Sequence, residues 1–281
     1  MVRFVRETVG FAESAGGAGC AGSLAAVTAA LLIACALGGL VAGGFVNTVI
    51  VRAPEGESLL HPGPQCPECR APIAWRDAVP VVSWFALGRR CRACADPIPS
   101  GYPLVEVANA ALWVAAGLRF GSSWVLLPYL FLFSVLLAQS VIDLELYRLL
   151  DRITFPALGA SVVMVVVVSL VEGAPGAILG AAIGAVAYFL FLFLPFIVYP
   201  KGMGFGDVKL ALLMGMYLGW LHPILPLFAV LAASLLGSVA GIGLYLARRG
   251  KSREFPFGPW LALGCVITIL ASEPLLDGFN G

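Results

Sequence analysis

The feature that most constrains this chain is a series of long stretches without any charged side chain. They cover residues 23–51, 120–142, 153–171, 173–200, 210–247 and 255–272. Most of them are near the roughly 20 apolar residues that a helix needs to cross a bilayer. The apolar–polar alternation of a membrane barrel is absent, so the pattern predicts an all-α polytopic membrane protein.

Two further segments decide how many times the chain is expected to cross. The apolar stretch 107–118 is short and must include Glu106 to reach across the membrane. The stretch 210–247 is too long for one span and contains the helix-breaking sequence 219–223. Dividing it gives a short segment, about 207–219, and a full one, about 223–247. The sequence therefore predicts about eight membrane segments, one of them short.

The distribution of basic residues predicts the orientation, because Lys and Arg are retained in cytoplasmic loops. With eight segments, one set of alternate loops carries fourteen of the 17 basic residues. The opposite loops carry only Arg119, and the N-terminal tail carries Arg3 and Arg6. We therefore expect both termini on the outside, and the loops after 51, 142 and 200 at the cytoplasmic face.

The chain divides into four parts. Residues 1–22 are polar enough for a short disordered tail, 23–51 form the first transmembrane helix, 52–101 form a cytoplasmic island, and 102–281 form the main membrane core. The first span is too long and uninterrupted for a cleaved signal peptide. A net charge of +1 argues against a nucleic-acid partner.

The island carries four of the seven cysteines, arranged as two Cys-x-x-Cys pairs: Cys66 with Cys69, and Cys91 with Cys94. Two such knuckles suit a tetrahedral zinc site, and a metal would supply folding energy that fifty residues lack. Two disulfides or a redox pair are the alternatives, which a reducing cytoplasm and the absence of a thioredoxin-like pattern disfavour. Four cysteine ligands leave no open position, so this zinc is expected to be structural.

Two aspartates stand where charge is costly. Asp143 follows a nearly unbroken apolar stretch, and Asp207 precedes the short segment in a glycine-rich sequence. An acid near the centre of a membrane helix costs roughly 2.5–3.5 kcal/mol. Capping of a helix end explains Asp207 moderately well but Asp143 poorly, because an acid at a helix C-terminus opposes the macrodipole. Both lie at cytoplasmic ends of their segments, so they are candidates for one functional site.

If the two carboxyls face each other in a low-dielectric site, they share a proton. The ionised member can then activate a water against a peptide carbonyl while the protonated member donates its proton. The sequence does not say which aspartate takes which role. Glycines 202, 204 and 206 would let the chain bend and let an extended substrate approach. The sequence shows no Gly-x-Ser-x-Gly elbow, and its two histidines lie away from the aspartates.

The chain resembles the bacterial type IV prepilin peptidases, also called leader peptidase/N-methyltransferases, which are GxGD-type intramembrane aspartic proteases. The resemblance covers about residues 38–272. It is carried by ordered motifs: 44–47 GFVN leading into 51–52 VR, the two cysteine knuckles, 83–84 SW with 88–89 GR, 102–106 YPLVE, 142–143 ID, 202–209 GMGFGDVK and 255–259 FPFGP.

The resemblance implies that Asp143 and Asp207 are the catalytic pair. It also implies that the protein removes the basic leader of prepilins and pseudopilins at the cytoplasmic face of the bacterial inner membrane. The new N-terminal residue would then be methylated with S-adenosylmethionine, and the substrates would serve type IV pili or type II secretion. The chain departs from the family pattern at Leu150, where family members usually have proline.

Several points stay open at this stage. Lys209 beside Asp207 could favour the ionised form of that acid or contact lipid phosphates. The methyl-donor site is expected near Glu106 and the island, although no motif identifies it. A peptidase without methyltransferase activity, and a zinc-stabilised scaffold or transporter, are the alternative functions. The sequence does not indicate the oligomeric state.

Overall fold

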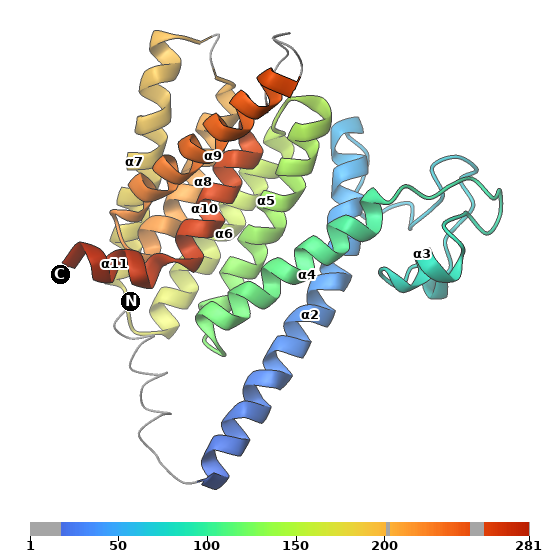
Figure 1. The fold of residues 1–281 in the computed structure, drawn as a ribbon, viewed down its shortest axis with the longest axis horizontal. Helices are drawn as coiled ribbons and strands as arrows, with labels where there is room; N and C mark the ends of the chain where they lie inside the picture. The colour runs from blue at the N-terminus through green and yellow to red at the C-terminus, as the bar shows by residue number, and fades with distance from the viewer. Residues whose placement is uncertain (1–17, 201–202, 248–255, 281) are drawn as a thin grey trace.

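The computed structural model describes residues 18–200, 203–247 and 256–280, and within them the only regular secondary structure is helical (Figure 1). The predicted tail therefore lies outside the described residues up to residue 17. Gly202 and the basic segment 248–253 also lie outside them. Each of the eight predicted segments holds one helix: α2 Ala18–Glu55, α4 Gly101–Phe120, α5 Leu126–Leu146, α6 Asp151–Val171, α7 Gly176–Val198, α8 Phe205–Leu221, α9 Leu225–Ala247 and α10 Gly258–Leu270.

Three smaller helices complete the described chain. The island contains a 3-10 turn, Trp75–Asp77, and the one-turn helix α3, Val82–Ala86. At the C-terminal end α11, Ser272–Asn280, follows α10 at a sharp bend of 70°. The predicted break in 210–247 is confirmed, because α8 ends at Leu221 and α9 begins at Leu225.

Not all eight helices satisfy the length and composition of a membrane span. Five described helices do so (α2, α5, α6, α7 and α9), and the bent pair of α10 and α11 would make six. Helix α8 has 17 residues and α4 carries Glu106, Asn109 and Arg119. These two helices therefore depend on neighbouring helices, and not on apolar composition alone, for their place in the membrane.

Helix α2 is longer at both ends than the predicted span 23–51. It begins at Ala18 and continues through Pro54 to Glu55. Its last turn includes Arg52, a buried side chain whose guanidinium donates to the carbonyl oxygens of Ser58, Pro62 and Gly63 at 2.7–3.1 Å. Arg52 thus holds the first loop of the island against the helix, in addition to its expected contribution to orientation.

The core lies around α5, α8 and α10, and α8 is the most deeply buried helix. Tyr129, Tyr217 and Trp220 are essentially inaccessible; the rings of Tyr129 and Trp220 stack, and Tyr217 meets both edge-on. Their polar atoms are all bonded: Tyr129 Oη donates to the Tyr217 carbonyl, Tyr217 Oη to Ser161 and Trp220 Nε1 to Ser169, at 2.8–2.9 Å. Such pairing is required away from water, so these bonds tie α8 to α5 and α6.

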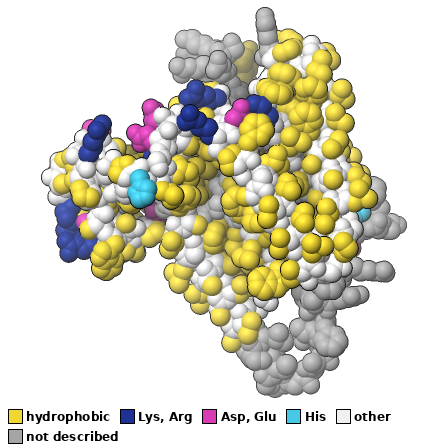
Figure 2. Space-filling view, turned by 180° about the vertical axis from the view of Figure 1, so that it is seen from behind, with side chains coloured by type: hydrophobic (Ala, Val, Ile, Leu, Met, Phe, Trp, Pro, Cys, Tyr) yellow, Lys and Arg dark blue, Asp and Glu magenta, His cyan; other side chains and the backbone are white. Residues whose placement is uncertain are grey.

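Most basic loops meet at one end of the helix bundle. The end of α2, the turn between α5 and α6 and the beginning of α8 are brought together there (Figure 1). From behind, apolar side chains cover the flank of the bundle while Lys and Arg side chains gather at this end and on the island (Figure 2). Arg119 lies apart from this group and pairs with Glu273 of α11, which agrees with its expected place in an opposite loop; the side of the membrane on which each loop lies stays a prediction.

Helices α7 and α8 approach each other through glycines. Gly180 and Gly184 of α7 lie against Gly215 and Gly219 of α8, and a Cβ built on Gly184 would stand 2.4 Å from the Gly215 carbonyl oxygen. Small residues at i and i+4 let helix backbones come close where no hydrophobic effect drives association. The α7–α8 contact therefore requires glycine at these positions.

We expect Gly184→Ala to destabilise the protein by about 1–3 kcal/mol, because the added methyl group meets backbone that cannot yield. Gly159→Ala in α6 is the matched control, since a Cβ there has no heavy atom within 4 Å. Alanine also favours a helix over glycine, so the control should be neutral or slightly more stable. Thermal unfolding in detergent compares the two, and equal stability of both variants would contradict the close α7–α8 contact.

Candidate active site and metal centre

The four island cysteines converge on one point. The Sγ atoms of Cys66, Cys69, Cys91 and Cys94 all lie within 4.8 Å of one another, and those of Cys66 and Cys94 are 3.9 Å apart. A tetrahedron with metal–sulfur bonds of about 2.3 Å has edges of about 3.8 Å. The arrangement therefore fits one tetrahedral metal, and zinc is the ion that four thiolates favour.

Both knuckles have the same backbone design. Arg70 donates its N–H to the Cys66 carbonyl and Ala95 to the Cys91 carbonyl, at 2.9 and 3.0 Å, and both donors adopt positive φ. No disulfide joins any of the four cysteines in the structure, which therefore does not support the alternative of two disulfides. Backbone N–H groups of Cys94 and Ala93 lower the pKa of Cys91 to about 7, whereas burial and the neighbouring thiols raise the pKa of Cys94 to about 12, so without a metal the four cysteines do not all ionise together.

Asp143 is held by the N-terminus of another helix. It lies near the end of α5, is 5% exposed, and its Oδ2 accepts the Gly258 N–H at 3.0 Å. Gly258 is the first residue of α10, so the carboxylate meets the positive end of that helix dipole. The sequence argument considered only the dipole of α5, and the favourable partner comes from a segment 115 residues away.

Asp207 lies in the first turn of α8 and is 7% exposed. Gly204 is the N-cap residue, and its backbone N–H is directed at the Asp207 carboxylate. This reciprocal contact resembles half of a capping box, so the predicted helix-end role of Asp207 is present. Because Asp207 is buried, it differs from a solvent-exposed helix cap: an acid away from water needs a hydrogen-bond or charge partner.

The structure brings the two aspartates together. Asp143 lies close enough to Asp207 for its charge to act on the Asp207 carboxyl. Leu149, in the turn after α5, closes this pair on one side. A Cβ on Gly206 would lie 2.9 Å from Leu149 Cβ, and one on Gly258 would lie 2.7 Å from the Asp143 carboxylate and 3.2 Å from Leu149. Glycines 206 and 258 therefore make room for the carboxyl pair and for Leu149.

A buried glutamine holds the turn that carries Leu149. Gln139 is fully buried in α5; its Oε1 accepts the Leu150 N–H at 3.2 Å, and its Nε2 donates to the Leu150 carbonyl at 3.2 Å and to Thr154 Oγ1 at 2.7 Å. A proline at position 150 has no N–H to donate. The leucine at this position therefore gains a hydrogen bond that the usual family residue cannot make. No motif in the sequence pointed to Gln139, a single amide in a mostly apolar helix.

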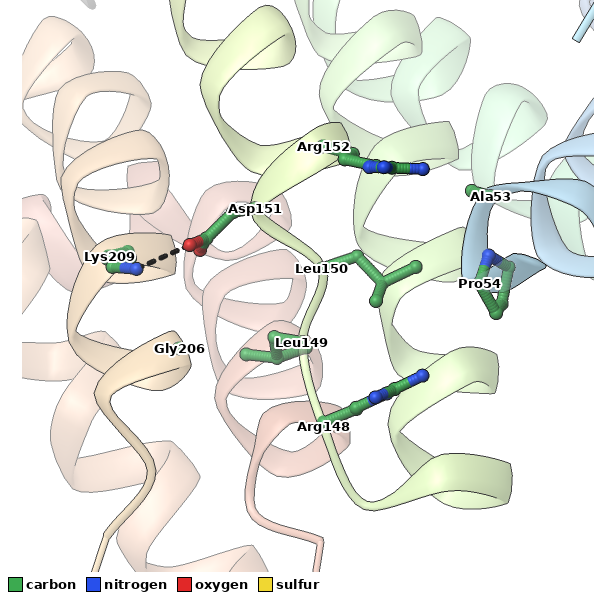
Figure 3. A pocket seen from close by; sticks show the side chains of 9 residues that line it. All are labelled: Ala53, Pro54, Arg148, Leu149, Leu150, Asp151, Arg152, Gly206 and Lys209. Atoms are coloured by element: carbon green, nitrogen blue, oxygen red, sulfur yellow. Dashed lines mark hydrogen bonds and ion pairs between the residues drawn. The ribbon is translucent and has the colours of Figure 1, made fainter. Parts of the chain in front are cut away.

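A cavity of about 390 Å³ opens beside Leu149 and Gly206 (Figure 3). Its wall includes an ion pair at 2.6 Å between Lys209 Nζ and Asp151. Lys209 therefore pairs with Asp151, and among the described residues it forms no ion pair with Asp207. Arg148 and Arg152 point toward the end of α2 (Figure 3), and neither has an ion pair within the described residues. The cavity is therefore positively charged on that side.

Glu106 joins the island to the membrane helices. Its Oε2 accepts the Val81 N–H at 2.7 Å, and Val81 has a φ of 61°, which is unfavourable for a β-branched residue. Gly43 of α2 packs against the Glu106 backbone, since a Cβ there would lie 2.6 Å from its Cα. These contacts indicate a positioning role. The predicted link of Glu106 to a methyl donor stays a prediction.

Two family models match this chain. Residues 37–120 match the bacterial peptidase A24 N-terminal domain, and residues 130–242 match the type IV leader peptidase family. No solved structure is significantly similar.

Proteins named prepilin leader peptidase/N-methyltransferase are similar over most of the chain. The one from Aeromonas hydrophila is 35% identical over 84% of this chain and 89% of its own length. The one from Burkholderia pseudomallei strain K96243 is 35% identical over 94% of both. A Myxococcus xanthus relative is 35% identical over 77% of this chain and 64% of its own length. With its paired aspartates and four-cysteine island in the matched regions, the chain belongs to the type IV leader peptidase family.

Proposed function

We propose that this protein is a prepilin leader peptidase that also methylates the N-terminus it creates. The observation that carries the peptidase part is the meeting of Asp143 and Asp207, two buried acids from different helices at the basic end of the bundle. The relatives' names supply the class of substrate and the second activity. The substrates would be prepilins or pseudopilins of type IV pili or type II secretion.

The surroundings of the two acids suit shared-proton chemistry. The Asp143 carboxylate accepts the Gly258 N–H, and the Gly204 N–H faces the Asp207 carboxylate, so backbone donors partly offset the cost of burying an ionised acid. The ionised acid takes a proton from a water as that water attacks the scissile carbonyl. The protonated acid gives its proton to the developing oxyanion or leaving amine.

The cavity beside Leu149 suggests which part of a substrate enters there. Arg148 and Arg152 would repel the basic residues of a leader. We propose that uncharged residues next to the cleavage site enter the cavity while the leader lies elsewhere on the cytoplasmic face. The same basic residues support a cytoplasmic location for this end in the bacterial inner membrane.

Zinc is proposed as a structural ion held by the four cysteines, where it would cross-link the two knuckles of the island. S-adenosylmethionine is proposed as the methyl donor on the basis of the family alone. The Glu106 carboxylate already accepts the Val81 N–H, so this contact does not support a methyl-donor site at Glu106.

The direct test is incubation of the purified full-length protein with a prepilin and S-adenosylmethionine, followed by mass spectrometry of the product. One cleavage after the leader with one added methyl group supports both activities. Cleavage without added mass leaves only the peptidase, and an intact prepilin contradicts the proposal.

We expect Asp143→Asn and Asp207→Asn each to reduce cleavage by about 10³-fold or more, because either change removes an acid or base while keeping the shape of the side chain. Glu172→Gln is the matched control. Its carboxylate accepts the Trp124 N–H at 3.2 Å, which an amide oxygen can still do. If either aspartate variant cleaves at the parent rate while remaining folded, the two-aspartate mechanism is wrong.

Gln139→Met should lower kcat about 10- to 100-fold with little change in KM, since the turn carrying Leu149 loses both of its bonds to Gln139. Thr154→Val removes another partner of Gln139 and keeps the bonds to Leu150, so its effect should be smaller. In a Leu150→Pro background the cost of Gln139→Met should shrink, because one of the bonds is already absent. Steady-state kinetics on the four variants test this coupling, and additive effects would contradict it.

Elemental analysis should find about one zinc per chain, and Cys66→Ser should lower this content strongly. Removal of zinc with a chelator should unfold the island while the membrane helices keep their circular dichroism. Cys265→Ser is the control, because this buried thiol of α10 lies outside the cysteine cluster. Zinc content unaffected by Cys66→Ser would count against the site.

A further inference from the structure

The island exposes an apolar surface around its two short helical turns, Trp75–Asp77 and α3. Trp75 is 85% exposed, Val82 and Phe85 are each 62% exposed, and Val79 is 40% exposed. We call these four residues the α3 patch. A Trp, a Phe and two Val residues so close in sequence are unusual on a surface that faces water.

The α3 patch is held outward by hydrogen bonds within the island. Ser83 is buried and its Oγ donates to the Arg76 carbonyl at 3.0 Å, while Trp84 Nε1 donates to the Ile98 carbonyl at 3.0 Å. These bonds occupy the inner face of α3 and leave Val82 and Phe85 on its outer face. The patch cannot turn inward without breaking them, so its exposure is built into the fold.

The contact with Glu106 sets the height of the patch relative to the membrane helices. Glu106 lies five residues into α4, which places it about 7–8 Å along the helix axis from Gly101 at 1.5 Å per residue. Its neighbours Leu104 and Val107 are 69% and 50% exposed, as expected for a lipid-facing surface. Because the Val81 N–H donates to Glu106, the beginning of α3 lies at about the same level along α4 as Leu104 and Val107.

Figure 1 agrees with this placement. Helix α3 forms the lower side of the island, turned toward the middle of the bundle rather than toward the end where α2 stops. From behind, apolar side chains are visible along the lower edge of the island, with Lys and Arg side chains beside them (Figure 2).

We propose that the α3 patch inserts into the headgroup and upper acyl layer of the same bilayer leaflet, and so holds the four-cysteine island against the membrane surface. Aromatic side chains are favoured at this level, where an apolar ring and a polar edge are both accommodated. Arg76 and Arg89 are exposed in the same segment and have no ion pair within the described residues; Arg89 Cζ lies 4.6 Å from the centre of the Trp84 ring, and both cations could contact anionic lipid phosphates.

Lipid is favoured over a protein partner because the bond between Val81 and Glu106 holds the patch near Leu104 and Val107, which are exposed apolar residues of α4. A water-soluble partner would have to enter the headgroup layer to reach Val82 and Phe85. Anchoring at two places, through Glu106 and through the patch, would prevent the island from tilting about its connections to α2 and α4. The proposal depends neither on the catalytic mechanism nor on the identity of the substrate.

The test measures the environment of Trp75 in the full-length protein reconstituted in phosphatidylethanolamine–phosphatidylglycerol vesicles. The difference in fluorescence between the parent and Trp75→Phe isolates Trp75 from the other five tryptophans. We expect lipids brominated near the headgroup to quench this difference signal by about half or more, lipids brominated near the chain end to quench it less, and aqueous iodide to have little effect.

Two outcomes would overturn the proposal. Quenching by iodide and not by brominated lipid would place the patch in water. Protection from both quenchers that disappears on dilution of protein in lipid would assign the patch to contact between copies of the chain. Failure of prepilin cleavage in the same preparation would leave this measurement interpretable, because the readout is independent of activity.

A double substitution, Val82→Ser with Phe85→Ser, provides a second test of whether the patch inserts into the membrane. It should raise iodide quenching of Trp75 at least about twofold, because less apolar surface holds the island in the membrane. Leu60→Ser is the matched control: Leu60 is also exposed on the island, at 73%, but lies outside the patch. Zinc content measured on each variant verifies that the island is folded. Unchanged quenching in the folded double variant would contradict insertion of the patch.

Discussion

The structure depends on placing two carboxyl groups within a membrane protein core without leaving either unpaired. A buried acid needs donors, and the described residues supply them from backbone rather than from cationic side chains. Gly258 at the start of α10 meets Asp143, and Gly204 at the start of α8 meets Asp207. Both donors belong to helix N-termini, where N–H groups are free and the dipole favours negative charge.

This requirement explains the arrangement of the helices around the site. Helix α8 must begin at the level of the aspartates, so it is short and surrounded by other helices. Its position is secured by close glycine contacts with α7 and by hydroxyl and indole hydrogen bonds to α6. Lys209 pairs with Asp151. The groups that act on the Asp207 carboxyl are therefore the backbone N–H of Gly204 and the carboxyl of Asp143.

The island is joined to this core at few but well-defined points. Arg52 fastens its first loop to the end of α2, and Glu106 fastens Val81 to α4. Between these points the two cysteine knuckles form a compact centre that fits a single zinc ion. These contacts fix the island relative to α2 and α4, which a flexible loop of the same length would not achieve.

The sequence by itself determined the all-helical membrane class, a helix in each of the eight predicted segments with the break after α8, and the cysteine cluster, and it indicated Asp143 and Asp207 as candidate site residues. These follow from local properties: runs of apolar residues, the spacing of cysteines, and the high cost of charge in a membrane. Only the tertiary structure decided how those charges are compensated. The Gly258 N–H donates to the Asp143 carboxylate, the Gln139 side-chain amide donates to the Leu150 carbonyl, and the Glu106 carboxylate accepts the Val81 N–H. A hydrogen bond of this kind leaves no periodic or compositional signal, because it depends on which helix ends and turns meet when the bundle packs.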